Sequence, residues 1–181
     1  MPIISTTTKK LQEKLGIKNI HAVPRITKIM VSVGVGKNRD NKQHIEAVQK
    51  DLATITGQKA KETRAKKSVA GFNVREGNLV GYSVTLRGKR MEDFLTRFVD
   101  ITLPRVRDFR GLSLKVLDGN GNASIGLTEQ LAFPEIHADK TDVIFGVGIT
   151  FVSTATDNET AENMFRALGF PFRKQGELDE N

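Results

Sequence analysis

The chain alternates apolar and polar residues in several short stretches, and each stretch predicts a strand with one buried face. The alternation is clearest in residues 29–35, 79–87 and 143–151. A shorter stretch, 58–64, would place lysines on its exposed side, which protects an edge strand from pairing with another chain. Residues 113–117 are a further possible strand. These stretches predict a sheet whose strands are separated by helices and loops.

Apolar residues three and four positions apart predict helices between these strands. Within residues 1–20 a short N-terminal helix is expected to end at Gly16. A longer helix is expected before Gly57, with Asp40 or Asn41 as its N-terminal cap. The apolar face of this longer helix consists of Ile45, Val48, Leu52 and Ile55.

Two further helices are predicted after the strand at 79–87. The first has the clearest apolar stripe in the chain and is expected to end or kink at Pro104. This stripe consists of Met91, Phe94, Leu95, Phe98 and Val99. The second helix is expected to open with a capping box of Thr156 and Glu159 and to end at Gly169. Both patterns predict helices that pack on a hydrophobic core.

The order of these elements favours an α+β fold. We expect a single domain over residues 1–181, with a mostly antiparallel mixed sheet, helices packed on one face and long loops. The strands alternate instead of being uniformly apolar, which argues against a doubly wound parallel sheet. Residues 118–122 contain two glycines and indicate a tight turn or a long hairpin loop. Residues 133–136 are expected to form an irregular connector, and residues 174–181 a frayed polar tail.

Composition narrows the class of protein. The 181 residues, 38% of them hydrophobic, are sufficient for one sizeable core. The absence of cysteine excludes disulfides and thiolate zinc sites, and it fits a reducing compartment. We expect neither a membrane span nor a secretory signal, because no run of about eighteen apolar residues occurs and the first residues lack an apolar region. The expected location is the cytoplasm.

Positive charge is concentrated in one segment, residues 59–90. This segment holds nine basic and two acidic residues, so its excess equals the net charge of +7 of the whole chain. The remaining residues balance at nineteen of each sign. Such a localised basic segment, with glycines and a phenylalanine at its centre, is typical of an element that docks on a polyanion.

The candidate catalytic motifs fail on spacing. Residues 34–38 read Gly-Val-Gly-Lys-Asn, whereas a nucleotide-binding loop needs four residues between its first glycine and a Gly-Lys pair, followed by Ser or Thr. The histidines His21, His44 and His137 are scattered, which argues against a metal site. The acidic pair at 92–93 is explained by the dipole of a helix start. We therefore predict a protein that is not an enzyme and has no catalytic residues, metal or cofactor.

Nucleic acid is the partner that the basic segment favours. Membrane binding would need an amphipathic helix with a basic face, but these residues lie in a strand, a loop and a strand. Lys59, Lys61 and Arg87 are candidate phosphate contacts. Only Phe72 and Tyr82 are aromatic candidates for base stacking, so recognition of a folded RNA by shape is favoured. The alternative is a protein-interaction module whose basic loop docks on an acidic protein.

Six motifs, read together, resemble the family of large-ribosomal-subunit protein five in its bacterial-length form. They are GQK at 57–59, RAKKSVAGF at 64–72, VTLRG at 84–88, LPRVRDFRGL at 103–112, FPEI at 133–136 and FPF at 170–172. The resemblance runs from about Pro24 to Arg173, with the motifs in family order. No motif covers the first twenty residues or the acidic tail.

The resemblance implies a structural protein of the large ribosomal subunit. Such a protein binds 5S rRNA, helps to attach it to the 23S-type rRNA in the central protuberance, contacts P-site tRNA and contributes to a bridge with the small-subunit head. The implied partners also include neighbouring 5S-associated ribosomal proteins and a small-subunit head protein, and exclude a membrane.

The resemblance also implies roles for individual residues. Besides the basic residues named above, 5S rRNA would be bound by Ser32, Gly34, Gly36, Lys37, Gln58 and Thr85. The loop that contacts tRNA would use Gly71, Phe72, Asn73, Val74, Arg75 and Gly77. The intersubunit contact would use Arg110, Glu135, His137 and Asp142.

Two positions depart from the family pattern, which has Asn where Ser32 stands and Pro where Ala60 stands. A serine hydroxyl can donate and accept a hydrogen bond but reaches less far than an Asn side chain. The basic segment itself is expected to divide into two functions. Its strands would form a fixed RNA-docking surface, and its loop would contact a second ligand separately.

Overall fold

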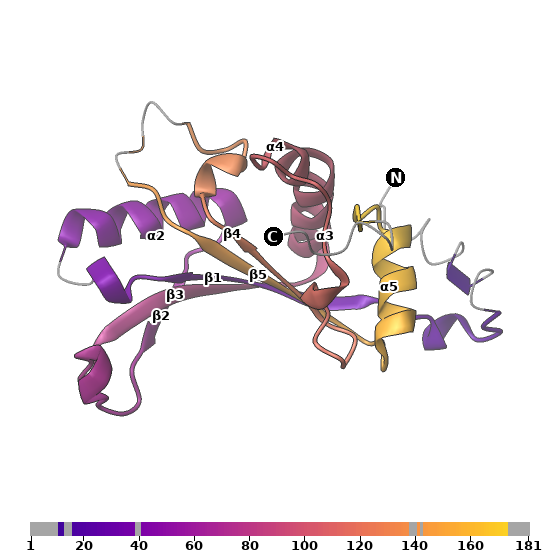
Figure 1. Cartoon of the computed structure of the whole chain (residues 1–181), viewed down its shortest axis with the longest axis horizontal. Helices are drawn as coiled ribbons and strands as arrows, with labels where there is room; N and C mark the ends of the chain where they lie inside the picture. Colours follow the sequence, from indigo (N-terminus) through magenta and orange to yellow (C-terminus); the bar gives the residue numbers. More distant parts are fainter. Residues whose placement is uncertain (1–10, 13–15, 39–40, 138–140, 142, 174–181) are drawn as a thin grey trace. The chain divides into compact units, whose positions relative to one another are not determined.

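The computed structural model describes residues 11–12, 16–38, 41–137, 141 and 143–173. Five strands form an antiparallel sheet in the order β2-β3-β1-β5-β4 (Figure 1). The strands are β1 (Ile26–Gly34), β2 (Lys61–Arg64), β3 (Leu79–Leu86), β4 (Ala123–Leu127) and β5 (Val147–Ser153). The main helices are α2 (Lys42–Thr56), α3 (Gly88–Arg97) and α5 (Asn158–Ala167), and α4 (Leu103–Arg105) is a single turn. The predicted α+β fold is confirmed.

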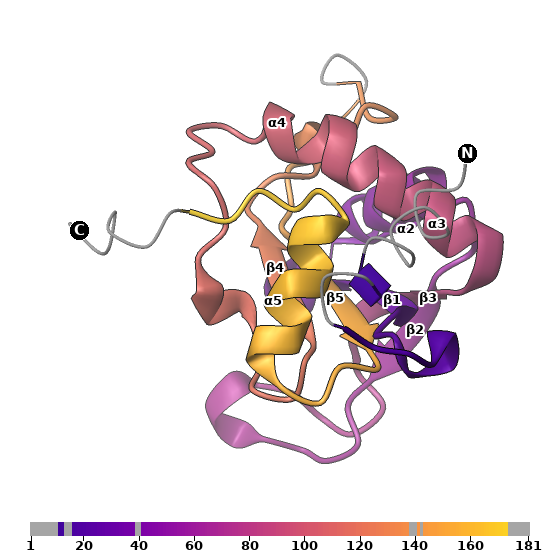
Figure 2. The same cartoon turned by 90° about the vertical axis from the view of Figure 1, so that its right-hand side faces the viewer.

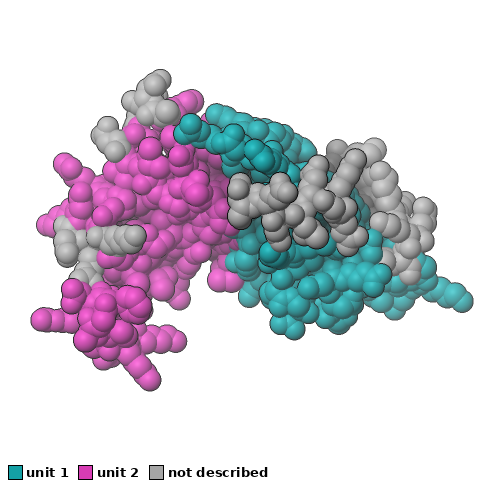
Figure 3. Space-filling view, in the orientation of Figure 1, with its two compact units in different colours: residues 1–29, 87–125, 150–181 teal, residues 30–86, 126–149 magenta. Residues whose placement is uncertain are grey.

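The chain divides into two compact units, which Figure 3 shows in different colours. Unit 1 comprises residues 1–29, 87–125 and 150–181, and unit 2 comprises residues 30–86 and 126–149. The segment from β2 to β3 therefore belongs to unit 2.

In unit 2, α2 has the boundaries that its capping residues predict. The Asn41 side chain accepts a hydrogen bond from the His44 N–H at 3.2 Å, and Gly57 ends the helix at φ 65°. The buried side of the helix includes Val48, Leu52 and Ile55. This face packs toward the sheet, so the predicted helix is confirmed, and of the two candidate caps the structure uses Asn41.

The strands of unit 2 also follow the predicted alternation. Val31 and Val33 of β1 and Tyr82, Val84 and Leu86 of β3 are buried. β2 pairs with β3 in antiparallel register, with Lys61 opposite Ser83, and lies at the edge of the sheet as predicted. All four residues of β2 are exposed.

Unit 1 is built around phenylalanine side chains. The Phe151 ring of β5 lies 5.5 Å from that of Phe98, 6.2 Å from that of Phe165 in α5, and 5.2 Å from that of Phe170. Figure 2 shows α5 beside β5 in this unit. The stripe predicted for residues 91–99 is buried here, so its assignment to the core is confirmed.

The helix that begins with α3 ends at Arg105, one residue past Pro104, where the sequence predicts an end or a kink. It widens into a π-helical turn, Phe98–Thr102, in which the Leu103 N–H bonds to the Phe98 carbonyl. It then passes through Pro104 in α4 before it ends. Pro104 lacks an N–H to donate, and the wider turn accommodates this loss.

Two predictions are wrong, one of a strand and one of a helix cap. Residues 113–117 form no strand, because the Ser113 hydroxyl accepts from the Lys115 N–H and caps a short 3-10 helix, Leu114–Val116. The cap of α5 is Asp157 and not Thr156: the Asp157 carboxylate accepts from the Thr160 N–H at 2.7 Å. That hydrogen bond, with a second from the Thr160 hydroxyl, holds the pKa of Asp157 below its usual value.

One strand and one strand boundary also differ from the predictions. The strand β4 is absent from the predictions, although Ala123, Ile125 and Leu127 alternate with exposed residues. It follows the predicted tight turn, in which the Asp118 carboxylate accepts from the Asn120 and Asn122 N–H groups. β5 begins at Val147 and not at residue 143. The predicted N-terminal helix falls mostly outside the described residues.

Candidate nucleic-acid interface

The sheet of unit 2 has one face covered by α2 and one polar face. The second face carries small or polar side chains on four strands, and its members are Ser32, Gly34, Lys61, Thr63, Ser83, Thr85 and Gly148. We call these seven residues the polar face. The buried apolar residues of the same strands point to the covered side, and exposed Met30 of β1 shares the polar side, so the alternation in the sequence leaves this face available to a partner.

On the polar face, Ser32 of β1 contacts Gly148 of β5. Its hydroxyl donates to the Gly148 carbonyl, with 3.4 Å between the two oxygens. A β-carbon at Gly148 would lie 3.1 Å from the Ser32 oxygen, so a side chain there would press on the hydroxyl. The long hydrogen bond is weak, and the Ser32 side chain is exposed. Ser32 can therefore bond to a partner at little cost.

Gly34 and Gly36 have no local structural reason to be glycine. Neither has a positive φ, and a β-carbon added at either would meet no described atom within 4 Å. Position 81, by contrast, must be glycine, because a β-carbon there would clash with the Val33 carbonyl oxygen. The open space at Gly34 and Gly36 lets an outside group approach the backbone closely. Lys37 follows in the 3-10 turn Gly36–Asn38.

Gln58 and Thr85 lie side by side at the end of β3, as the prediction of a joint site requires. The Gln58 amide donates to the Thr85 carbonyl oxygen, with 3.5 Å between nitrogen and oxygen. Lys59, Lys61 and the Thr85 side chain are exposed. Arg87 is exposed as well but belongs to unit 1. Gln58 and Thr85 thus lie at the end of β3, whereas Gly34 and Gly36 lie near its start, where the Val35 N–H donates to the Val80 carbonyl.

Arg64, a cation of the basic segment, makes bonds within the protein. Arg64 pairs with Glu62 at 2.7 Å and also donates to the Gly77 carbonyl at 3.2 Å. These bonds fix the base of the loop that follows β2. Arg64 therefore has a structural role, whereas Lys59 and Lys61 project from the edge of the sheet.

Of the two candidate aromatics, only Phe72 is accessible. Tyr82 is 3% exposed, and burial is the main reason that its pKa is raised, with a smaller contribution from the Glu62 carboxylate. Phe72 is 79% exposed. Tyr82 thus belongs to the core, and stacking on a base can involve Phe72 alone of the two.

The loop between β2 and β3 is a regular extension of the hairpin. Val69 and Val74 form a β-bridge with hydrogen bonds of 2.8 and 3.2 Å, and a 3-10 turn, Ala70–Phe72, lies between them. Asn73 and Gly77 adopt left-handed backbone conformations. Of the six residues predicted to contact tRNA, Val74 is half-buried and the others are exposed.

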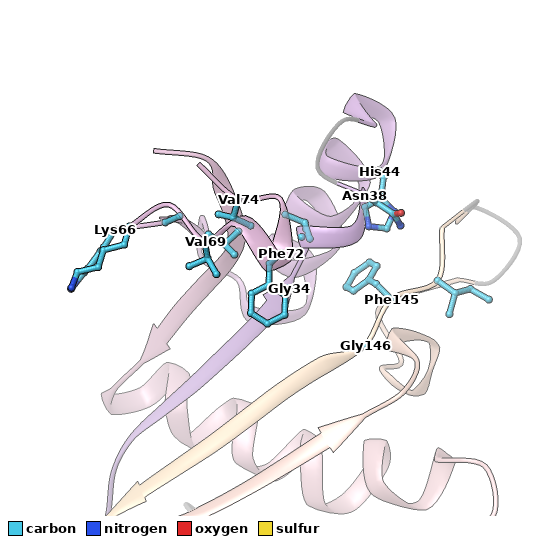
Figure 4. A pocket seen from close by; sticks show the side chains of 15 residues that line it. Gly34, Asn38, His44, Lys66, Val69, Phe72, Val74, Phe145 and Gly146 are labelled. Atoms are coloured by element: carbon cyan, nitrogen blue, oxygen red, sulfur yellow. The ribbon is translucent and has the colours of Figure 1, made fainter. Parts of the chain in front are cut away.

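A pocket of about 1080 Å³ lies within unit 2, between this loop and the end of β1. We call it the Phe72 pocket (Figure 4). Its lining comes from several segments and comprises Gly34, Val35, Gly36, Asn38, His44, Ala65, Lys66, Lys67, Val69, Phe72, Val74, Val80, Ile144, Phe145 and Gly146. The pocket is therefore lined by residues from both the predicted tRNA loop and the predicted 5S rRNA site.

The wall at residues 143–146 depends on a side chain that sequence reasoning missed. Gln130 is fully buried; it accepts from the Phe145 N–H at 2.9 Å and donates to the Val143 carbonyl at 2.5 Å. These bonds replace those of a neighbouring strand, which explains why β5 begins late. Two effects act on the pKa of the Asp51 carboxyl. Burial is the larger and raises this pKa, whereas a hydrogen bond with the Gln130 side chain lowers it. Gln130 follows Glu129 in the sequence, so its neighbours give no signal that its side chain is buried.

The residues predicted for the intersubunit contact are divided between the two units. Arg110 is exposed in unit 1, whereas Glu135, which is half-buried, and His137, which is exposed, belong to unit 2. Asp142 lies outside the described residues.

In the described part of the chain, no helix is long and apolar enough to cross a membrane. No group of three potential metal ligands occurs among the same residues.

Comparison with known proteins gives matches along nearly the whole chain. Residues 19–75 match the family model for ribosomal protein L5, and residues 79–172 match the model for the C-terminus of the same ribosomal family. Large ribosomal subunit protein uL5 of Prochlorococcus marinus strain MIT 9211 is 51% identical over 168 residues, covering 93% of this chain and 94% of the relative. The same protein of strain NATL1A is 49% identical over 170 residues, covering 94% and 95%.

Proposed function

Because the chain belongs to the ribosomal protein L5 family and is therefore a non-enzymatic protein of the large ribosomal subunit, we propose that it binds 5S rRNA through the polar face. The observation that carries this proposal is the pair Gly34 and Gly36. Both lie at the end of β1, where nothing within the described chain requires glycine. A backbone left open in this way suits an RNA that presses directly on the strand.

The chemistry of the polar face supports RNA as the ligand. Ser32 and Thr85 offer hydroxyl groups that bond to sugar or phosphate oxygens and to base edges. Lys59 and Lys61 lie beside them and can neutralise phosphates. A flat surface of short side chains follows the shape of a folded RNA more closely than long side chains would.

We further propose that the loop 71–77 contacts P-site tRNA. Gly71, Asn73, Arg75 and Gly77 are exposed at the end of the hairpin. An exposed arginine among residues with short side chains suits a phosphate contact with an RNA that binds and leaves. Attachment of 5S rRNA to the 23S-type rRNA, and a bridge to the small-subunit head through Arg110, Glu135 and His137, belong to the same proposal.

The proposal is tested by filter binding of the protein to 5S rRNA and to an unrelated RNA over a range of salt. We expect tighter binding to 5S rRNA, and a log-log salt slope of roughly −0.7 to −0.9 for each phosphate neutralised. Equal affinity for both RNAs at every salt concentration would contradict the proposal.

A protein-interaction module with an acidic partner is the second candidate, because charge alone does not separate an acidic protein from RNA. Co-purification with and without RNase separates the two. Partners that are lost after RNase favour RNA binding, whereas partners that remain favour the interaction module.

A further inference from the structure

Apolar surface is gathered at the Phe72 pocket. Among the described residues, six large hydrophobic side chains are exposed, and three of them line this pocket. They are Phe72, Ile144 and Val69, at 79%, 59% and 44% exposure. Ile144 and Phe72 are far apart in the sequence, so the cluster arises from the fold. A concentration of this kind indicates a binding site more strongly than single exposed residues do.

The charged side chains that line the described part of the pocket are all positive. Lys66 and Lys67 are exposed and lie at the pocket, and none of the described residues that line it is acidic. Asn38 and His44 add polar groups to the opposite wall (Figure 4). An apolar floor beside two cations suits a ligand that is both flat and anionic, which is the chemistry of a nucleotide.

The walls of the pocket are held in place before any ligand binds. The Val35 N–H donates to the Val80 carbonyl at 2.9 Å, and the Val69–Val74 bridge fixes the loop side. On the remaining side Gln130 fixes Phe145. A preformed pocket loses little entropy on binding, which favours specific occupation.

We propose that the Phe72 pocket binds unpaired nucleotides of ribosomal RNA, with a base stacked on the Phe72 ring and the flanking phosphates on Lys66 and Lys67. The proposal rests on the function proposed above and deepens it. Gly34 and Gly36 belong both to the pocket and to the proposed 5S rRNA site, so an RNA on the polar face extends to the pocket. A paired helix hides the faces of its bases, and therefore only unpaired nucleotides can stack here.

A fluorescent probe at the pocket tests this directly. The chain has no tryptophan, so Phe72→Trp introduces a single one. We expect quenching of its fluorescence by 5S rRNA and by single-stranded oligoadenylate, and no quenching by a blunt RNA duplex of the same length. The matched control is Ile20→Trp, which places a tryptophan at an exposed apolar position of unit 1 and should not respond to the oligonucleotide.

A second set of variants measures the contribution of the ring. Phe72→Ala should weaken binding of oligoadenylate roughly tenfold or more, as expected for loss of one base stack, and Phe72→Tyr should restore it. Since Phe72 is exposed, the melting temperature should not change. Lys66→Ala with Lys67→Ala should weaken binding and reduce its salt dependence.

Several outcomes would overturn the inference. These are quenching by a glutamate-rich peptide but not by oligoadenylate, quenching by tRNA but not by 5S rRNA, or an equal response of Ile20→Trp. Failure here differs from failure of the proposed function. If 5S rRNA binds in the filter assay without quenching Phe72→Trp, the pocket inference alone is wrong; if oligoadenylate quenches and 5S rRNA is not preferred, the 5S assignment alone is wrong.

Discussion

The two units use the same aromatic residue for opposite purposes. In unit 1 the rings of Phe98, Phe151 and Phe170 are sealed from solvent, with centroids 5.2 to 6.4 Å apart. In unit 2 the Phe72 ring is exposed at the edge of a pocket. The first arrangement stabilises the fold, and the second leaves apolar surface uncovered. Surroundings rather than residue type separate the stabilising side chains from those available for binding.

Glycines show the same contrast. Gly121 in unit 1 has φ 80°, and a β-carbon there would clash with the Ala155 backbone. Gly34 in unit 2 has an ordinary φ and open space around it. The fold requires the first glycine, whereas only an outside partner would require the second.

The largest effect is expected from truncation of the core of unit 1. Phe151→Ala removes the ring that contacts Phe98, Phe165 and Phe170, and should lower the free energy of unfolding by about 3–5 kcal/mol. Urea unfolding followed by circular dichroism measures this. A loss below about 1 kcal/mol would mean that the phenylalanines of unit 1 are not the stabilising cluster described here.

Charge reversal in unit 2 should lower the affinity for RNA and leave the stability of the protein unchanged. Lys59→Glu with Lys61→Glu should reduce affinity for any RNA at least tenfold at low salt, because each lysine neutralises a phosphate and each glutamate repels one. The urea midpoint should stay within the error of the parent protein, since both side chains are exposed. A large fall in stability with unchanged RNA affinity would reverse the contrast between the units.

The two glycines can be compared by the same substitution. Gly34→Val should leave stability nearly unchanged and weaken 5S rRNA binding roughly tenfold, since its methyl groups would occupy space proposed for RNA. Gly121→Val should destabilise the protein, because both its φ and its neighbours exclude a side chain. Thermal melting and filter binding on both variants separate these effects. The contrast fails if Gly34→Val binds 5S rRNA as tightly as the parent protein.

The smallest effect concerns specificity. Gln58→Ala should reduce the preference for 5S rRNA over an unrelated RNA by about 1 kcal/mol, the size of a single hydrogen bond. The hydrogen bond to Thr85 is long, so little stability should be lost. Equal losses of affinity on both RNAs would mean that Gln58 carries no specificity.

Much of the fold is visible in the sequence because the signals are local. Asn41 and Gly57 delimit α2, and the apolar alternation of β1 and β3 separates their buried and exposed faces. The start of β5 could not be predicted. It depends on the Gln130 side chain, which bonds to the Phe145 backbone across fifteen residues of sequence.

The candidate site is only partly visible in the sequence. The basic charge and the family resemblance indicate residues of the polar face, and the structure pairs Lys61 with Ser83 and Gln58 with Thr85. The Phe72 pocket is different, because Ile144 reads as one member of an alternating strand. Only the folded chain brings Ile144 and Phe72 to the same pocket, together with the end of β1.

The central claim is that 5S rRNA lies on the polar face of unit 2, and filter binding of two variants tests it most directly. Thr85→Glu places one carboxylate on that face, and Arg110→Glu makes a larger change of charge at an exposed position of unit 1. We predict that Thr85→Glu loses 5S rRNA binding while Arg110→Glu retains it. Retention by Thr85→Glu with loss by Arg110→Glu would contradict the claim.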